Sequence, residues 1–149
     1  MFVAGILILA TGCGSQKAPD AKITGLSSGK ERRISDLKGK VVLIDAWDTW
    51  CGPCRETMPI VQKMYNEFGS KGLEVVAVST ETPLMVESFV KATDYSYPFY
   101  IDTDNSFQEA YKITEIPKCF LIDKSGAIVF QGHPGDEQDL REAIEAALR

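Results

Sequence analysis

The chain has 149 residues, which is enough for one domain with a substantial core and too few for two domains of ordinary size. Hydrophobic residues make up 44% of the sequence and charged residues 25%, a balance typical of soluble globular domains. The formal net charge of -5 argues against a nucleic acid or an acidic membrane surface as the partner. Length and charge therefore favour a single acidic domain that binds no nucleic acid.

The beginning of the chain differs from the rest. Residues 1–12 are mainly apolar, and this segment is shorter than the roughly 20 residues that a membrane-spanning helix needs, so it is typical of a signal peptide. The small residues before Cys13 resemble a lipobox, which implies cleavage there and lipid attachment to the Cys13 sulfur. Residues 13–22 would then form a flexible tether, and residues 23–149 the folded domain. No Lys or Arg precedes the apolar segment, so either the start codon is assigned too late or the signal is atypical. The alternative is an ordinary secretory signal in which Cys13 is incidental.

Apolar patterning along the rest of the chain predicts an α/β fold. The expected elements are a hairpin over 21–34, a strand over 40–47, a helix from 53 to about 69, a strand over 73–79, a helix over 83–92, a strand over 97–101, a helical segment over 105–112, hairpin strands over 118–122 and 128–131, and a helix over 136–148. This order predicts a central mixed sheet with helices on both faces and a β-hairpin at its N-terminal end.

Cys51 and Cys54 lie where a buried strand is followed by a helix. Their spacing allows the two sulfurs to alternate between dithiol and disulfide without a change of fold. Cys51 is expected at the helix N-terminus, where free N–H groups and the helix dipole stabilise a thiolate. We therefore interpret Cys51 as the attacking thiol and Cys54 as the resolving thiol. A C-x-x-C pair is also half of a zinc site, so a zinc-binding module that uses Cys119 and His133 as well stays open as an alternative.

Several separated motifs resemble the thioredoxin superfamily, and more narrowly the TlpA/ResA-like oxidoreductases that share a domain with the AhpC/TSA redoxins. The matching segments are Leu37 to Asp45, Trp47 to Arg55, Met58-Pro59, Ile116-Pro117, Phe120 to Asp123, and Gly126. The resemblance implies a three-layer thioredoxin-like fold and a thiol-disulfide oxidoreductase without a cofactor. A thiol peroxidase of the AhpC/TSA type is a further alternative, although the P-x-x-x-T-x-x-C pocket of those enzymes is missing.

The resemblance also implies partners and a location. Protein disulfides would be the substrates, and an upstream thiol would supply electrons. The protein would be a monomer outside the cytoplasm, in the periplasm or on the outer face of a bacterial membrane, held there by lipid on Cys13. Gly52-Pro53 is the intervening pair of reducing members of the superfamily, so we expect a disulfide reductase.

Roles for further residues follow from the same resemblance. Asp45 is expected to be buried, because the rest of its strand is apolar, and to titrate high, because no lysine stands on the neighbouring strand. The resemblance implies that Asp45 accepts the proton of Cys54. Pro117 is expected to be a cis-proline that faces the dithiol. Substrate binding is expected to involve Trp50, Gly52, Pro53, Ile116 and Pro117.

Three positions depart from the family pattern. Asp48 replaces a small residue, and it is either a charge that opposes the Cys51 thiolate or a solvated loop acid. Thr57 stands where ResA-like proteins often carry an acid. Cys119 replaces a threonine, and it is either a buried inert thiol or a third redox-active group close to the dithiol.

Overall fold

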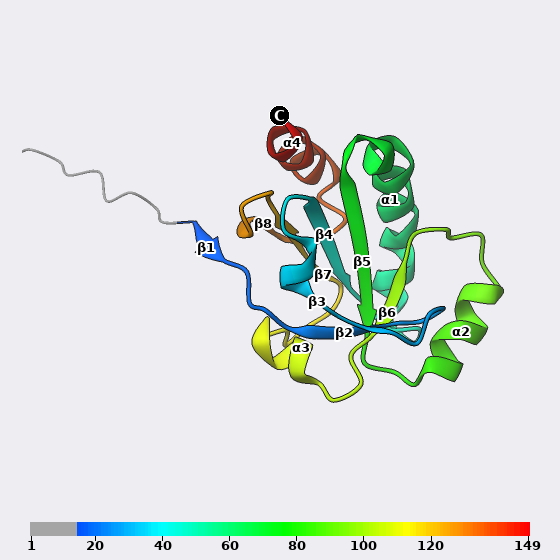
Figure 1. Ribbon diagram of the computed structural model, residues 1–149. Helices are drawn as coiled ribbons and strands as arrows, with labels where there is room; N and C mark the ends of the chain where they lie inside the picture. Colours follow the sequence, from blue (N-terminus) through cyan, green and yellow to red (C-terminus); the bar gives the residue numbers. More distant parts are fainter. Residues whose placement is uncertain (1–14) are drawn as a thin grey trace, which may run out of the picture.

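A computed structural model of the protein describes residues 15–149, so the expected signal segment 1–12 and the expected lipidation site Cys13 lie outside the described residues. The chain forms one mixed sheet with the strand order β1-β8-β7-β4-β5-β6-β2-β3 (Figure 1). Its strands are β1 (Gln16–Lys17), β2 (Lys22–Gly25), β3 (Glu31–Arg33), β4 (Val41–Ala46), β5 (Leu73–Ser79), β6 (Phe99–Ile101), β7 (Lys118–Ile122) and β8 (Ala127–Gly132). The helices are η1 (Ile34–Leu37), α1 (Gly52–Phe68), η2 (Gly69–Lys71), α2 (Pro83–Lys91), α3 (Ser106–Ala110) and α4 (Glu137–Leu148).

The directions of the strands follow from their connections. β4, β5 and β6 are parallel, because α1 and α2 return the chain to the same end of the sheet between them. β7 and β8 are joined by a short turn and are antiparallel, and β7 pairs with β4. The predicted N-terminal hairpin is confirmed as β2 and β3, and β2 extends the sheet by pairing with β6.

The expected tether differs from the structure in its described part. Gln16 and Lys17 form β1 and pair with β8, and the Ala18 N–H donates to the Gly126 carbonyl at 2.9 Å. Ala21 is buried in the core. The folded part of the chain therefore begins before residue 23. Two strand residues are too few to show an alternating pattern, so the sequence could not reveal this pairing.

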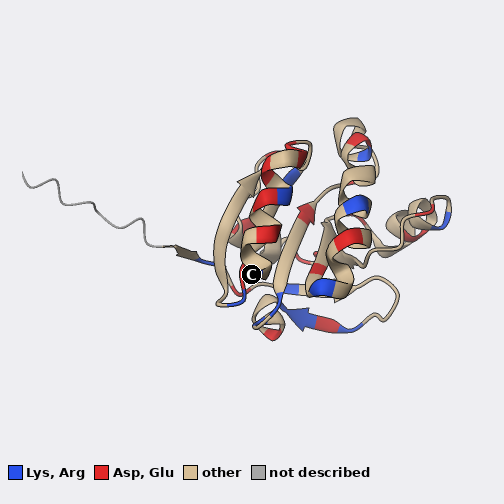
Figure 2. Cartoon of the chain, turned by 90° about the horizontal axis from the view of Figure 1, so that it is seen from above, with Lys and Arg blue, Asp and Glu red and all other residues tan. Residues whose placement is uncertain are grey.

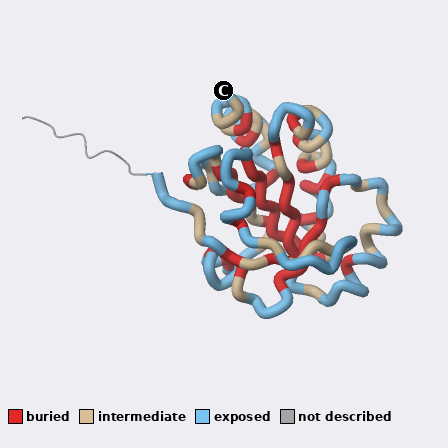
Figure 3. Tube along the Cα trace, in the orientation of Figure 1, coloured by how far each residue is buried: buried red, intermediate tan, exposed pale blue. Residues whose placement is uncertain are grey.

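Two apolar layers lie on either side of the sheet, and strand alternation assigns residues to each. The layer under α1 and α4 includes Val41 and Leu43 of β4 and Trp47, which directly follows this strand. The layer under η1 and α3 includes Val42 and Ile44, which point to the opposite face of the sheet. Figure 3 shows the buried residues concentrated along the central strands. The predicted three-layer arrangement is confirmed.

The helices keep their charged residues on the solvent side. Figure 2 shows acidic and basic residues interspersed along them, and Arg141 of α4 pairs with Glu67 of α1. This pattern is typical of helices that cover a sheet with one apolar face. Among residues 15–149, no helix combines the length and the apolar character needed to cross a membrane.

Candidate active site

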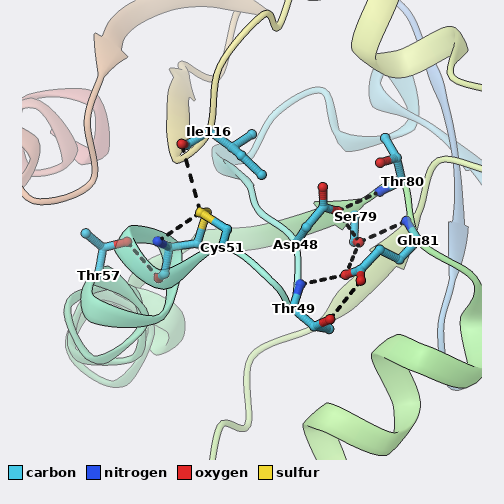
Figure 4. The surroundings of a disulfide bond; sticks show 9 residues. Asp48, Thr49, Cys51, Thr57, Ser79, Thr80, Glu81 and Ile116 are labelled. Atoms are coloured by element: carbon cyan, nitrogen blue, oxygen red, sulfur yellow. Dashed lines mark hydrogen bonds between the residues drawn. A yellow bond between two sulfur atoms is a disulfide. The ribbon is translucent and has the colours of Figure 1, made fainter.

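The two cysteines of the C-x-x-C segment form a disulfide at the start of α1. Cys51 is the N-cap residue with extended backbone angles, and Gly52 and Pro53 begin the helix. Proline suits this first turn because its missing N–H has no partner there and its fixed φ fits a helix. The Cys54 N–H donates to Cys51 Sγ at 3.2 Å (Figure 4). A backbone donor is therefore already aimed at the sulfur that would carry the thiolate charge after reduction.

Both cysteines are buried in the disulfide form. Cys51 is 3% exposed and Cys54 is 1% exposed, whereas the neighbouring Trp50 is 69% exposed. Cys51 Sγ lies 3.9 Å from the carbonyl oxygen of Ile116. The Ile116-Pro117 bond is cis, as predicted. The chain before β7 therefore lies directly beside the disulfide.

Asp45 of β4 is buried on the same side of the sheet as Cys54. It is 1% exposed, and its Oδ1 atom accepts no hydrogen bond from the described residues. Its neighbours on the adjacent strands are Ala77 and Cys119, and neither brings a positive charge. Burial raises the pKa of Asp45 to about 7. The expected burial and high pKa are confirmed, and the proton-accepting role stays a prediction.

Asp48 is not the solvated loop acid that was one of its two interpretations. It is 8% exposed, and its Oδ1 accepts hydrogen bonds from the Ser79 hydroxyl at 2.6 Å and the Thr80 N–H at 3.2 Å. Burial raises its pKa, while the Ser79 hydroxyl acts in the opposite direction. The backbone carbonyl of Asp48 accepts from the Cys51 N–H at 3.2 Å. A buried carboxylate thus lies in the turn that leads into the dithiol.

A second carboxylate, that of Glu81, links this turn to the end of β5 by hydrogen bonds. Glu81 accepts hydrogen bonds from the Thr49 N–H and, at 2.7 Å, from the Thr49 hydroxyl (Figure 4). The Glu81 N–H donates to the Ser79 hydroxyl at 3.1 Å. Sequence reasoning missed these contacts. The available signal was a run of polar residues directly after a buried strand that runs parallel to β4, because the carboxyl ends of parallel strands meet at one edge.

A groove of about 540 Å³ opens beside the disulfide. It is lined by Asp48, Trp50 and Thr80, by Gln108 of α3, and by residues 113–116 of the segment between α3 and β7. Trp50 and Ile116, both expected to bind substrate, therefore line one hollow next to Cys51. Gly52 and Pro53 belong to the first turn of α1 and do not line it.

Thr57 lies in α1, three residues after Cys54. It is buried, and its hydroxyl donates to the Cys54 carbonyl at 3.0 Å. A neutral side chain thus occupies the position where ResA-like proteins often carry an acid, and it supplies no proton acceptor for Cys54. Among the expected site carboxylates, Asp45 is left for that role.

The four residues of the zinc alternative are not assembled into a site. Residues 15–149 contain no group of three or more His, Cys, Asp or Glu side chains arranged to hold a metal ion. Cys51 and Cys54 are joined to each other, and Cys119 is fully buried. His133 is exposed in a turn, where its Nδ1 accepts from the Gly135 N–H at 2.9 Å. The geometry therefore favours thiol chemistry over metal binding.

A thioredoxin fold with a Cys-Gly-Pro-Cys pair at the start of α1 defines a thiol-disulfide oxidoreductase, and this chain is a member of that class. More narrowly, the Redoxin family profile matches residues 14–148, and the chain belongs to the Redoxin family.

Curated relatives and solved structures agree with this assignment. The chain is 38% identical over 115 residues to a thiol-disulfide oxidoreductase ResA of Bacillus cereus, covering 76% of this chain and 66% of that one. It is 36% identical over 135 residues to ResA of Bacillus thuringiensis subsp. konkukian, covering 90% and 76%. The match thus spans about two thirds of the length of the first relative.

Two solved structures illustrate the shared fold. A Chlorobium tepidum protein assigned as the thiol:disulfide interchange protein DsbE superposes with a TM-score of 0.82 at 31% identity, over 91% of this chain and 97% of that one. The exposed lipoprotein thioredoxin of Streptococcus pneumoniae superposes with a TM-score of 0.72 at 26% identity, over 85% and 98%. The thioredoxin-like fold class is confirmed.

Proposed function

We propose that this protein reduces disulfide bonds of extracytoplasmic proteins by thiol-disulfide exchange at Cys51 and Cys54. The observation that supports this most directly is the hydrogen bond from the Cys54 N–H to Cys51 Sγ at the N-terminus of α1. In the reduced protein this donor and the helix dipole would favour the Cys51 thiolate over the thiol. The thiolate is the nucleophile that opens a disulfide.

The first step joins the protein to its client. The Cys51 thiolate attacks one sulfur of the client disulfide, the client sulfur-sulfur bond breaks, and the second client sulfur leaves as a thiolate. A mixed disulfide between Cys51 and the client results. The groove beside Cys51 and the nearby Ile116 carbonyl would hold the client chain during this step.

The second step releases the client. Cys54 loses its proton to Asp45, and the Cys54 thiolate attacks Cys51 Sγ. The bond between Cys51 and the client breaks, so the client leaves as a dithiol after taking up protons, and the protein keeps the disulfide. Asp45 suits this role because its pKa of about 7 lets it accept and return a proton near neutral pH.

The catalytic cycle also requires an electron donor and a cellular location. An upstream dithiol would reduce the Cys51-Cys54 disulfide and restore the starting state. Lipid on Cys13 would hold the protein at a bacterial membrane outside the cytoplasm, and the name of the related pneumococcal structure, an exposed lipoprotein thioredoxin, supports this location. Gly52-Pro53, the intervening pair of reducing members of the superfamily, favours the reducing direction. The buried Asp48 carboxylate near Cys51 favours it as well, because a nearby negative charge raises the pKa of a thiol.

Substrate trapping tests this function. In Cys54→Ser the mixed disulfide cannot be resolved, so the variant should accumulate clients bound to Cys51 that are released by dithiothreitol. Cys51→Ser is the matched control and should trap nothing, and Cys119→Ser should behave like the unmodified protein. Equal trapping by the Cys51→Ser and Cys54→Ser variants would contradict the proposed roles.

The reduction potential of the Cys51-Cys54 pair tests whether the protein reduces or oxidises its clients. Reducing thioredoxins have a reduction potential of about -270 mV, and strong oxidants have one of about -120 mV. We expect the potential of this protein to lie near the first value. Equilibration of Cys51 and Cys54 with glutathione or dithiothreitol buffers, followed by alkylation and mass spectrometry, measures it. A value near that of strong oxidants would rule out a reductase.

A further inference from the structure

We propose that the groove beside the disulfide selects clients that carry a lysine or arginine next to the attacked cysteine. This inference rests on the proposed function and adds the substrate class. The groove is lined by the two acids Asp48 and Glu115, and its other lining residues are uncharged. A hollow lined by one sign of charge favours an occupant of the opposite sign.

Asp48 is the fixed part of this recognition site. Its Oδ1 holds the Ser79 hydroxyl and the Thr80 N–H, and Figure 4 shows its second carboxylate oxygen turned away from that network. Because two hydrogen bonds already set the orientation of the carboxylate, little side-chain entropy would be lost on binding a cation. Within residues 15–149, no lysine or arginine lines the groove to neutralise it. A cation from the client would bring the first positive charge to this groove.

The exposed Trp50 ring adds a second element of recognition. It lines the same groove and is 69% exposed, a large value for a tryptophan in a folded domain. The aliphatic part of a lysine or arginine side chain can pack on such a ring, and its charged end gains from the negative face of the ring. A neutral polar side chain of similar length would gain the packing and lose the charge interaction.

The position of the groove fixes where the cation lies in the client. Ile116 lines the groove, and its carbonyl oxygen is 3.9 Å from Cys51 Sγ. A client cysteine bonded to Cys51 would therefore place its neighbouring residues over the groove. An extended chain advances about 3.3 Å per residue, so the cation is expected within about two residues of the attacked cysteine.

Three cystine peptides test this inference. They share one sequence and carry lysine, glutamine or glutamate directly beside the cysteine. The measured quantity is kcat/KM for reduction by the protein, divided by the rate of reduction of the same peptide by dithiothreitol alone, which removes differences in intrinsic disulfide reactivity. We expect the lysine peptide to be preferred over the glutamine peptide by about tenfold, as one charge-assisted hydrogen bond provides, and the glutamate peptide to be slowest.

Variants of the protein assign the preference to the groove. Asp48→Asn keeps an oxygen that can accept from Ser79 and Thr80, and it should bring the ratio of lysine to glutamine rates close to one. Glu115→Gln changes an exposed residue, so it should fold, and it should lower the ratio in part. Glu109→Gln removes the same charge from an exposed position on α3 outside the groove, and it should leave the ratio unchanged.

The outcomes separate this inference from the proposed function. If the unmodified protein reduces all three peptides equally well after normalisation, the charge preference is wrong and the reductase function stands. If it reduces none of them faster than Cys51→Ser does, the proposed function itself fails. A preference that is the same in Asp48→Asn and Glu115→Gln as in the unmodified protein would place the recognition outside this groove and overturn the inference.

Discussion

Asp45 lies directly opposite Cys119 in the antiparallel pairing of β4 with β7, and both side chains are buried. Burial, together with the nearby Asp45 carboxylate, raises the pKa of Cys119 to about 12. Cys119 is therefore a neutral thiol at physiological pH and a poor nucleophile. Of the two interpretations of this residue, the structure favours the buried inert thiol.

Selective alkylation checks the state of Cys119. In the folded and reduced protein at pH 8, iodoacetamide should modify Cys51 within minutes and leave Cys119 unmodified. In denaturant Cys119 should react like an ordinary thiol, which serves as the control for reagent access. Rapid labelling of Cys119 in the folded protein, or a Cys119 disulfide after oxidation, would contradict this prediction.

The pH dependence of stability reports the burial of Asp45. Its pKa is about 4 in an unfolded chain and about 7 in the folded protein, so the folded state holds this proton more tightly. Below about pH 4 the group is protonated in both states and contributes nothing. As pH rises from about 4 to 7, Asp45 ionises in the unfolded chain and stays protonated in the folded protein, so folding must take up a proton and the folded state loses stability. Above pH 7 the loss is complete.

Asp45→Asn removes this effect. The oxidised variant should be more stable than the unmodified protein above pH 7, by up to about 4 kcal/mol, since each tenfold change in a dissociation constant corresponds to about 1.4 kcal/mol. The difference should vanish near pH 4. Urea denaturation from pH 4 to 8 measures it, and Asp94→Asn, which changes an exposed aspartate, is the control that should show no such trend.

The same substitution should slow the release of the client. If Asp45 accepts the Cys54 proton, the resolution rate of a preformed mixed disulfide should rise with pH through about 7 as Asp45 ionises. Asp45→Asn should lower this rate by roughly a hundredfold at neutral pH and remove the inflection near pH 7. Stopped-flow measurement with a chromogenic disulfide follows the step. An unchanged rate and pH profile would assign the proton to another acceptor or to water.

Much of the fold and of the dithiol site could be predicted from the sequence, because their signals are local. The apolar run before Cys51 predicts a buried strand, and the following three- and four-residue spacing predicts α1. The burial of Asp45 also followed from its place on an otherwise apolar strand. Each of these inferences uses residues that are close together in the chain.

The remaining features depend on contacts between distant segments. Thr49 and Glu81 are 32 positions apart, and their contact exists only because β4 and β5 end at the same edge of the sheet. The groove joins the turn before Cys51 to the segment before β7 in the same way. β1 was missed because its two residues carry no pattern, and its partner β8 is more than 100 positions away. Periodicity in one segment cannot report such pairings.

The contact between Glu81 and Thr49 leads to a prediction about the turn before the dithiol. Glu81→Gln replaces the carboxylate by a neutral amide, so the two charge-assisted hydrogen bonds with Thr49 become neutral and weaker. We expect the free energy of unfolding to fall by about 1 to 2 kcal/mol and the reduction of a neutral disulfide peptide to slow, because the turn that positions Trp50 and Cys51 loosens. Glu87→Gln on α2 is the control, since that side chain is exposed and its ion pair is with Lys91 of the same helix.

A double-mutant cycle with Thr49→Ala separates this contact from other effects of the substitution. Thr49→Ala removes the hydroxyl that donates to Glu81 and keeps the backbone N–H. If the two side chains act through their hydrogen bond, the loss of stability in the double variant should be smaller than the sum of the two single losses, by about 1 kcal/mol. Additive losses would show that Glu81 stabilises the protein through other partners, such as Ser79, and that the hydroxyl of Thr49 does not fasten the turn to the end of β5.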